Sequence, residues 1–248
     1  MSRTLERGDV FFFYRLRVGL EEAHEPGDVQ RLFLLLKPDR RRLFRRVIVG
    51  RKRLPDPLTH ERVWAFVAEV AHRLSEARDD IGPAVYETRT RGIRVEPPAR
   101  PAGEGRYALV DHGGHTHLAY ALELPPEPGD VQRALGIERE ASSIVAVRNP
   151  DAPAPPGAGL PPQRRAQLPP ELTERFGGRR FAPVDPPEML DYEGIELVMI
   201  GASVDVDAEL GIDLDAHAER LETADIFRKL RIRPEQVPTE PLETGRWA

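Results

Sequence analysis

The chain has no cysteine in its 248 residues, so it forms no disulfide and carries no thiol chemistry. Cysteine nucleophiles, cysteine zinc sites, iron–sulfur clusters and redox switches are thereby excluded. A chain of this length buries a core without covalent cross-links. Because a cysteine-free composition fits a reducing compartment, we expect a cytoplasmic protein.

Long apolar runs are also missing. The longest span residues 10–14, 32–36 and 197–202, well short of the roughly 18 residues that a membrane-spanning helix needs. The charged amino-terminal residues precede only a short apolar run, without the hydrophobic region and cleavage site of a signal peptide. We therefore expect no membrane contact and no export signal.

Lysine and asparagine are scarce: the chain has three lysines, 33 arginines and one asparagine. Codon bias in a GC-rich genome explains this better than hyperthermophily, whose compositional signal is Lys and Glu enrichment. The net charge of −5 is unevenly spread, because residues 31–53 carry ten bases and one acid whereas residues 191–248 carry 14 acids and six bases. We expect an electrically bipolar molecule.

Several catalytic signatures are absent. The chain contains no G-x-x-x-x-G-K-[ST], G-x-G-x-x-G or H-E-x-x-H motif, so P-loop NTPases, Rossmann dehydrogenases and zincins receive no support. The acidic residues from Asp205 onward fail as an EF-hand, because Leu210 and Ala216 stand where Gly and Glu are required. Ser203 lacks the second glycine of a nucleophile elbow, which disfavours a serine hydrolase.

Alternating apolar and polar residues predict most of the secondary structure. Strands are expected at 9–18, 32–36, 43–49, 86–91, 106–110, 116–124, 143–147 and 195–200. Pro38-Asp39-Arg40 and Gly113-Gly114 are turn signals that predict two hairpins.

Apolar residues spaced by threes and fours predict a helix over 57–78 with Thr59 as its N-cap, and another over 215–230. Shorter helices are expected at 130–135 and after Pro169-Pro170. The predicted fold class is α+β, a mostly antiparallel β-sheet with a few helices and a Pro-rich connecting segment.

Three regions are expected along the chain. Residues 1–148 form a β-rich α+β domain, and residues 149–188 form a linker or wrapping arm because they contain 11 prolines in 40 positions. Residues 189–248 form a small strand-loop-helix part that packs on the first domain.

The basic stretch is the first candidate site. A hairpin that combines it with apolar residues predicts a groove for phosphates, with nucleic acid or another polyanion as the partner. The candidate polyanion-binding residues are Arg40, Arg41, Arg42, Arg45, Arg46, Arg51, Lys52 and Arg53. The alternative is that these charges meet the chain's own acidic carboxyl-terminal part.

A histidine cluster is the second candidate. A hairpin at Gly113-Gly114 places His115 and His117 on one face of a strand, with His112 near the end of its partner. Together with Asp111, these imidazoles form a candidate first shell for a divalent metal such as Zn²⁺ or Mn²⁺. The alternative is that these histidines are polar residues of a solvated turn and bind no metal.

Four segments carry a family resemblance: Arg-Gly-Asp-Val-Phe-Phe-Phe-Tyr-Arg (7–15), Gly-Arg-Lys-Arg-Leu-Pro (50–55), His-Thr-His-Leu-Ala-Tyr-Ala-Leu-Glu-Leu (115–124) and Leu-Asp-Tyr-Glu-Gly (190–194). With them the chain resembles a family of uncharacterised bacterial proteins over nearly its whole length. The resemblance implies a bacterial source and no activity, cofactor or catalytic residue.

Three functions follow from these patterns. The first is a non-catalytic binding module that contacts a polyanion through the Arg-rich hairpin. The second is a metal-dependent enzyme built on the His-rich hairpin. The third is an interaction scaffold or homo-oligomer in which the basic and acidic regions dock.

Overall fold

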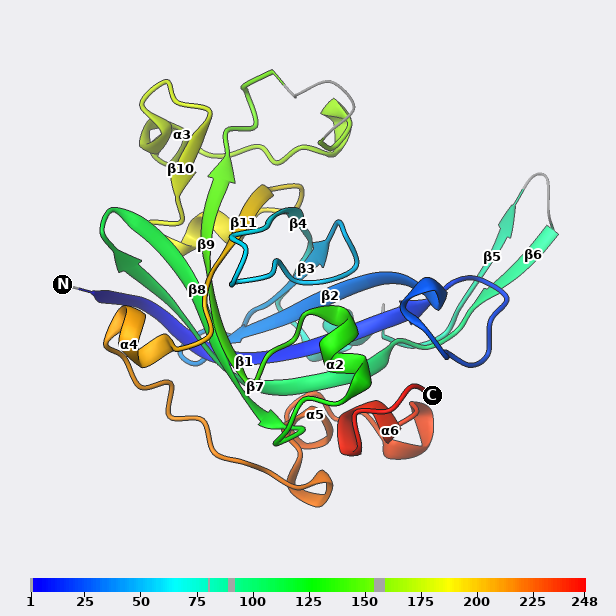
Figure 1. Ribbon diagram of the computed structural model, residues 1–248. Coiled ribbons are helices and arrows are strands. Elements are labelled where there is room, and N and C mark those ends of the chain that lie inside the picture. The colour runs from blue at the N-terminus through cyan, green and yellow to red at the C-terminus, as the bar shows by residue number, and fades with distance from the viewer. Residues whose placement is uncertain (1, 80, 89–91, 154–158) are drawn as a thin grey trace.

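The computed structural model describes residues 2–79, 81–88, 92–153 and 159–248. Eight antiparallel strands follow one another in the order β9-β11-β4-β3-β2-β1-β7-β8, and β8 pairs back onto β9 to close a barrel (Figure 1). These strands are β1 (Arg3–Leu16), β2 (Val29–Pro38), β3 (Phe44–Val49), β4 (Arg62–Ala71), β7 (Arg100–His112), β8 (His115–Leu124), β9 (Glu140–Arg148) and β11 (Glu196–Ser203).

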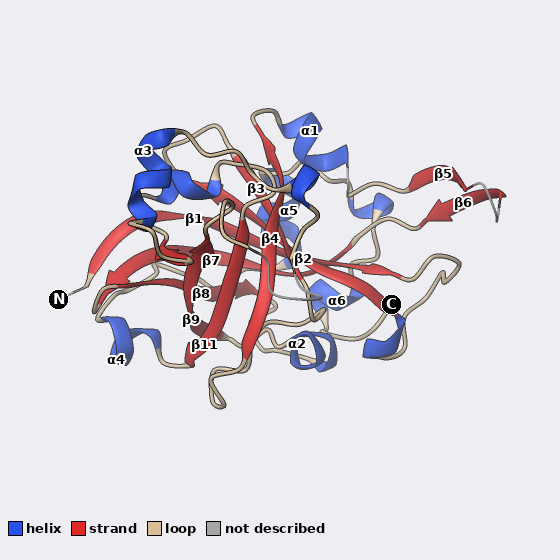
Figure 2. Ribbon diagram, turned by 90° about the horizontal axis from the view of Figure 1, so that it is seen from above, coloured by secondary structure: helices blue, strands red, loops and turns tan. Residues whose placement is uncertain are grey.

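Three further strands lie outside the barrel. β10 (Phe181–Pro183) pairs with the end of β9, while β5 (Ala84–Thr88) and β6 (Gly92–Glu96) form a two-stranded ribbon. That ribbon projects away from the barrel in both views (Figures 1 and 2).

The helices are short and lie around the barrel. They are α1 (Leu74–Asp79), α2 (Asp130–Leu135), α3 (Pro170–Thr173), α4 (Val206–Leu210), α5 (Asp225–Arg228) and α6 (Glu240–Glu243), with 3-10 turns at 26–28, 162–164, 174–176, 187–190, 221–223 and 234–236. Within the described ranges, no helix has both the length and the apolarity to traverse a membrane.

The predicted α+β class is wrong, because the protein is a closed barrel with 37% strand and 21% helix. The main error is the helix predicted over 57–78. Val63, Val67 and Ala71 stand four residues apart, a spacing that fits a strand as well as a helix, and they lie on β4. The helix predicted over 215–230 is also wrong, since only the 3-10 turn at 221–223 and α5 form there.

The predicted hairpins are confirmed. β2 and β3 pair antiparallel on either side of the Pro38 turn. Gly113 and Gly114 join β7 to β8 with φ of 60° and 83°, a left-handed conformation that glycine adopts without a Cβ clash. Turn chemistry therefore identified two of the barrel's connections.

One apolar cluster, the inner core, fills the barrel. Alternate residues of all eight strands contribute to it, for example Phe12 of β1, Leu34 of β2, Leu109 of β7 and Leu197 of β11. Since successive side chains of a strand point to opposite faces, these positions define the inward face.

A second cluster, the outer core, lies on the opposite face of β1 and β2. There Phe11, Phe13 and Phe33 pack against Ile226 and Leu230. A third small cluster joins Ala108, Val110 and Ala119 of β7 and β8 to Val206 and Leu210 of α4. Residues 204–243, the carboxyl-terminal arm, thus cover one side of the barrel, where their orange-to-red ribbon is seen (Figure 1).

Candidate functional site

The predicted basic surface is not a single surface, because its central residue is buried. Arg45 is the second residue of β3 and is 0% exposed. Its guanidinium donates to both carboxylate oxygens of Glu6, at 2.5 and 3.1 Å, and its Nε donates to Asp191 at 2.8 Å. The Tyr107 hydroxyl donates to the same Glu6 carboxylate at 2.7 Å. Burial lowers the pKa of Arg45, but the hydrogen bond to Glu6 and the charges of Glu6, Tyr107 and Asp191 together raise that pKa above its ordinary value.

Five more of the predicted residues are engaged within the chain. Arg41 pairs with Asp191 and Glu188, Arg46 with Glu69, Arg51 and Arg53 with Glu61, and Lys52 donates to the carbonyl oxygen of Val29. Glu188 is the last residue of the predicted linker, and Asp191 is the first residue of the acidic carboxyl-terminal part. The basic stretch therefore meets the chain's own acids at several of its positions.

Arg40 and Arg42 differ from the rest. Both are exposed in the turn between β2 and β3. Neither has a hydrogen-bond or ion-pair partner among the residues that the structure describes. These two guanidinium groups are the part of the predicted set that remains open to a partner.

A groove of about 640 Å³ runs beside this turn. It is lined by Arg3, Thr4, Leu5, Glu6 and Arg7 of β1, by Pro38, Asp39, Arg40 and Arg41 of the turn, and by Asp185, Pro186, Pro187 and Glu188. The Arg3 guanidinium pairs across its mouth with Asp185 at 2.6 Å, and these side chains are 61% and 40% exposed. Such an exposed pair contributes little stability.

The histidine hairpin has the predicted register. His112 pairs with His115 and Val110 with His117, so the three imidazoles lie on one face of β7 and β8. The rings of His112 and His117 are perpendicular, with centroids 5.8 Å apart. His112 Nδ1 contacts the Ser2 hydroxyl at 2.9 Å, and His115 is exposed.

The fourth predicted ligand, Asp111, lies on the opposite face. It pairs with Thr116 in the ladder, and its carboxylate lies 3.4 Å from the Arg3 guanidinium. Over residues 2–79, 81–88, 92–153 and 159–248, no group of three or more His, Asp or Glu is arranged to hold a metal ion. The structure thus gives the metal hypothesis no ligand set.

His117 instead contacts the carboxyl-terminal arm. Its Nδ1 lies 3.6 Å from Glu209 of α4, and the other oxygen of Glu209 accepts a hydrogen bond from Ser142. Burial lowers the pKa of His117, opposed by Glu209 and reinforced by the two neighbouring histidines.

Acidification should therefore destabilise the protein through His117. A lowered folded pKa means that the stability contribution is complete above the unfolded value of about 6.5 and is lost as pH falls below it. Melting temperatures between about pH 8 and about pH 5 test this. Acidification should destabilise His117→Gln less than wild type, whereas His72→Gln, which replaces an exposed histidine outside this cluster, should behave like wild type. The same acid dependence in all three proteins would contradict the assignment.

Comparisons with known proteins do not assign the chain to a family. The chain matched no family model, no curated protein and no solved structure. The resemblance to a bacterial family therefore stays a prediction.

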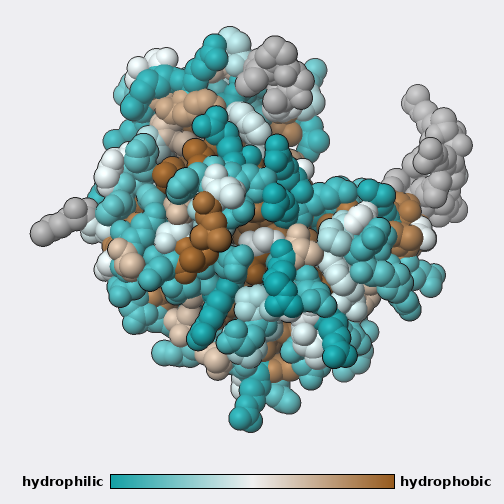
Figure 3. All heavy atoms as spheres, in the orientation of Figure 1, coloured by the Kyte–Doolittle hydropathy of each residue, from teal (hydrophilic) through white to brown (hydrophobic). Residues whose placement is uncertain are grey.

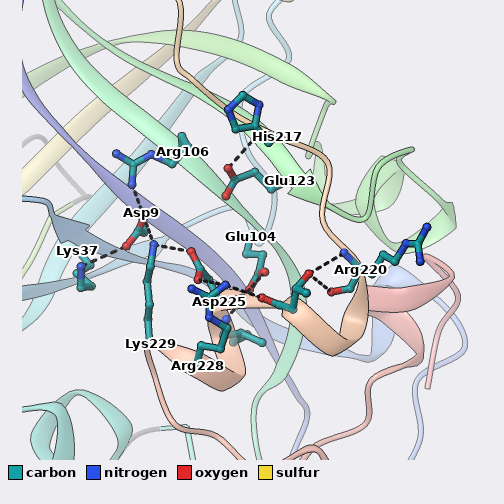
Figure 4. A network of polar contacts seen from close by, with 12 residues as sticks. Asp9, Lys37, Glu104, Arg106, Glu123, His217, Arg220, Asp225, Arg228 and Lys229 are labelled. Carbon is teal, nitrogen blue, oxygen red and sulfur yellow. Dashed lines mark hydrogen bonds and ion pairs between the residues drawn. The ribbon is translucent and has the colours of Figure 1, made fainter.

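Sequence reasoning missed a buried polar network between the barrel and the carboxyl-terminal arm (Figure 4). At its centre, the Asp9 carboxylate is 2% exposed and accepts from Lys37 at 3.2 Å, from Lys229 at 2.8 Å and from Arg106. Lys229 also pairs with Asp225 at 2.5 Å. No motif marks Asp9, which lies within β1, directly before the apolar run at residues 10–14.

Glu104 is the second part of this network. Its carboxylate is 1% exposed and accepts the backbone N–H groups of Asp225 and Ile226 at 2.7 and 2.6 Å. Burial raises the pKa of Glu104 to about 8, with Glu219 and Asp225 adding to the rise. A carboxyl with a raised pKa is a functional-site signal in a cleft, but at this depth Glu104 meets no solute. It attaches α5 to the barrel.

Proposed function

We propose that the protein is a non-catalytic binding module that takes an anionic partner in the groove between β1, the β2–β3 turn and residues 185–188. The observation that carries this proposal is the exposed position of Arg40 and Arg42 without partners among the described residues. Guanidinium groups bind carboxylates and phosphates through paired hydrogen bonds. The groove's volume of about 640 Å³ lies within the usual range for ligand sites.

The number of open cations favours an acidic protein segment over nucleic acid. Each phosphate contact adds roughly 0.7 to the salt slope of single-stranded nucleic acid binding, so two arginines support a slope of only about 1.4. If all eight predicted cations were open, the expected salt slope would be roughly 5.6. The face seen in Figure 3 is mostly hydrophilic, with hydrophobic residues in small separate groups. A mostly hydrophilic surface suits a partner that is recognised through charge and hydrogen bonds.

Removing the two open arginines should weaken binding of an acidic peptide. The probe is a fluorescein-labelled octapeptide of alternating valine and glutamate, followed by fluorescence anisotropy. Arg40→Ala with Arg42→Ala should lower its affinity about tenfold or more, since charge-assisted hydrogen bonds are lost.

The matched control is Arg51→Ala with Arg53→Ala, which removes the same charge where both side chains already pair with Glu61. It should bind the peptide like wild type. Equal loss in both double variants would show that net charge, and not the groove, governs binding. The cytoplasmic location and the homo-oligomer remain predictions from composition and charge.

A further inference from the structure

The groove contains an open strand edge. β1 pairs with β7 from Arg3 onward, but on its other side it pairs with β2 only from Gly8, opposite Pro38. Beyond that point the Asp39 N–H still donates to the Arg7 carbonyl at 3.0 Å. On the β2 side, no described residue bonds to the backbone of residues 3–6.

The opposite wall of the groove does not complete this ladder. It consists of residues 185–188, and two of these four positions, Pro186 and Pro187, have no backbone N–H to donate. The open edge covers four residues, and on its β7 side the pairing is irregular between Thr4 and Glu6. An unpaired strand edge is a template for another strand, and proteins use such edges to recognise extended peptides.

We infer that an extended acidic peptide adds to the open edge of β1, in the position that β2 would occupy if it continued past Pro38. This inference rests on the proposed function and names the partner at the same groove. Main-chain hydrogen bonds to residues 3–6 provide the docking. Arg40 at the turn and Arg3 at the mouth select acidic side chains.

Peptide backbone chemistry separates strand addition from simple charge attraction. In an added strand, alternate residues direct their N–H groups to the neighbouring edge while the others face away. Three octapeptides of identical charge are therefore compared with wild-type protein: the alternating valine–glutamate probe, the same peptide N-methylated at its valines, and the same peptide N-methylated at its glutamates.

The expected result is that one N-methylated peptide binds roughly thirtyfold more weakly than the unmodified probe, because at least two ladder hydrogen bonds are lost. The other should bind within about threefold of the probe, since its methyl groups face away from β1. Hydrogen exchange of backbone amides in residues 3–6 should slow when the unmodified peptide binds.

Three outcomes overturn the inference. Equal binding of all three peptides, with unchanged amide exchange in residues 3–6, would leave the anion groove intact but exclude strand addition. Binding of none of them would refute the proposed function as well. Tight binding of a single-stranded oligodeoxynucleotide without binding of the peptide would assign the groove to nucleic acid instead.

Discussion

Arg45→Ala should destabilise the protein by about 3–5 kcal/mol, the largest effect expected of any single substitution in the basic stretch. The side chain is fully buried and pairs with both Glu6 and Asp191. Its removal leaves two carboxylates facing each other without their shared cation. Urea unfolding followed by circular dichroism measures the change in the free energy of unfolding.

Arg42→Ala is the matched control, three positions away in the same stretch. Because Arg42 is exposed and has no partner among the described residues, its loss should change stability by no more than about 0.5 kcal/mol. Similar stability of the two variants would mean that Arg45 is not the buried cation described above.

Glu104→Gln should change the pH dependence of stability more than any other carboxyl substitution. The folded pKa of about 8 lies above the ordinary value of 4.5. Between these values the folded protein holds a proton that the unfolded chain has released, so stability is complete below about pH 4.5 and falls as pH rises toward 8. A shift of this size corresponds to a loss on the order of 5 kcal/mol.

The glutamine variant does not titrate, so its stability should fall less between about pH 5 and about pH 9 than that of wild type. Near pH 5 it should be the less stable protein, because an amide oxygen replaces only one of the two acceptors for Asp225 and Ile226. Exposed Glu127→Gln serves as the control and should follow wild type. Parallel curves for all three proteins would contradict the raised pKa of Glu104.

Local chemistry allowed the hairpins to be predicted, because a turn at Gly113-Gly114 needs only the residues that form it. Barrel closure was not predictable in the same way. It depends on β7 pairing with β1 and on β11 pairing with β4, which are contacts between strands far apart in the sequence. The spacing of Val63 and Val67 fits two periods, and tertiary packing decided between them.

The candidate site was predicted in part. The density of arginine in residues 31–53 pointed to the region that contains the turn between β2 and β3, but charge counting did not separate buried Arg45 from exposed Arg40. That difference arises from partners far along the chain, such as Asp191. The open edge of β1 was not predicted either, since it depends on where β2 stops relative to β1.

Mapping the bound peptide on the protein tests most directly whether the groove beside β1 is the binding site. Titration of the alternating valine–glutamate octapeptide into nitrogen-15-labelled protein reports binding residue by residue. We expect amide shift changes concentrated at the non-proline positions of residues 3–7, 38–41 and 185–188, the three segments that line the groove. Changes centred on the β5–β6 ribbon or on the histidine hairpin, or no changes at all, would contradict this expectation.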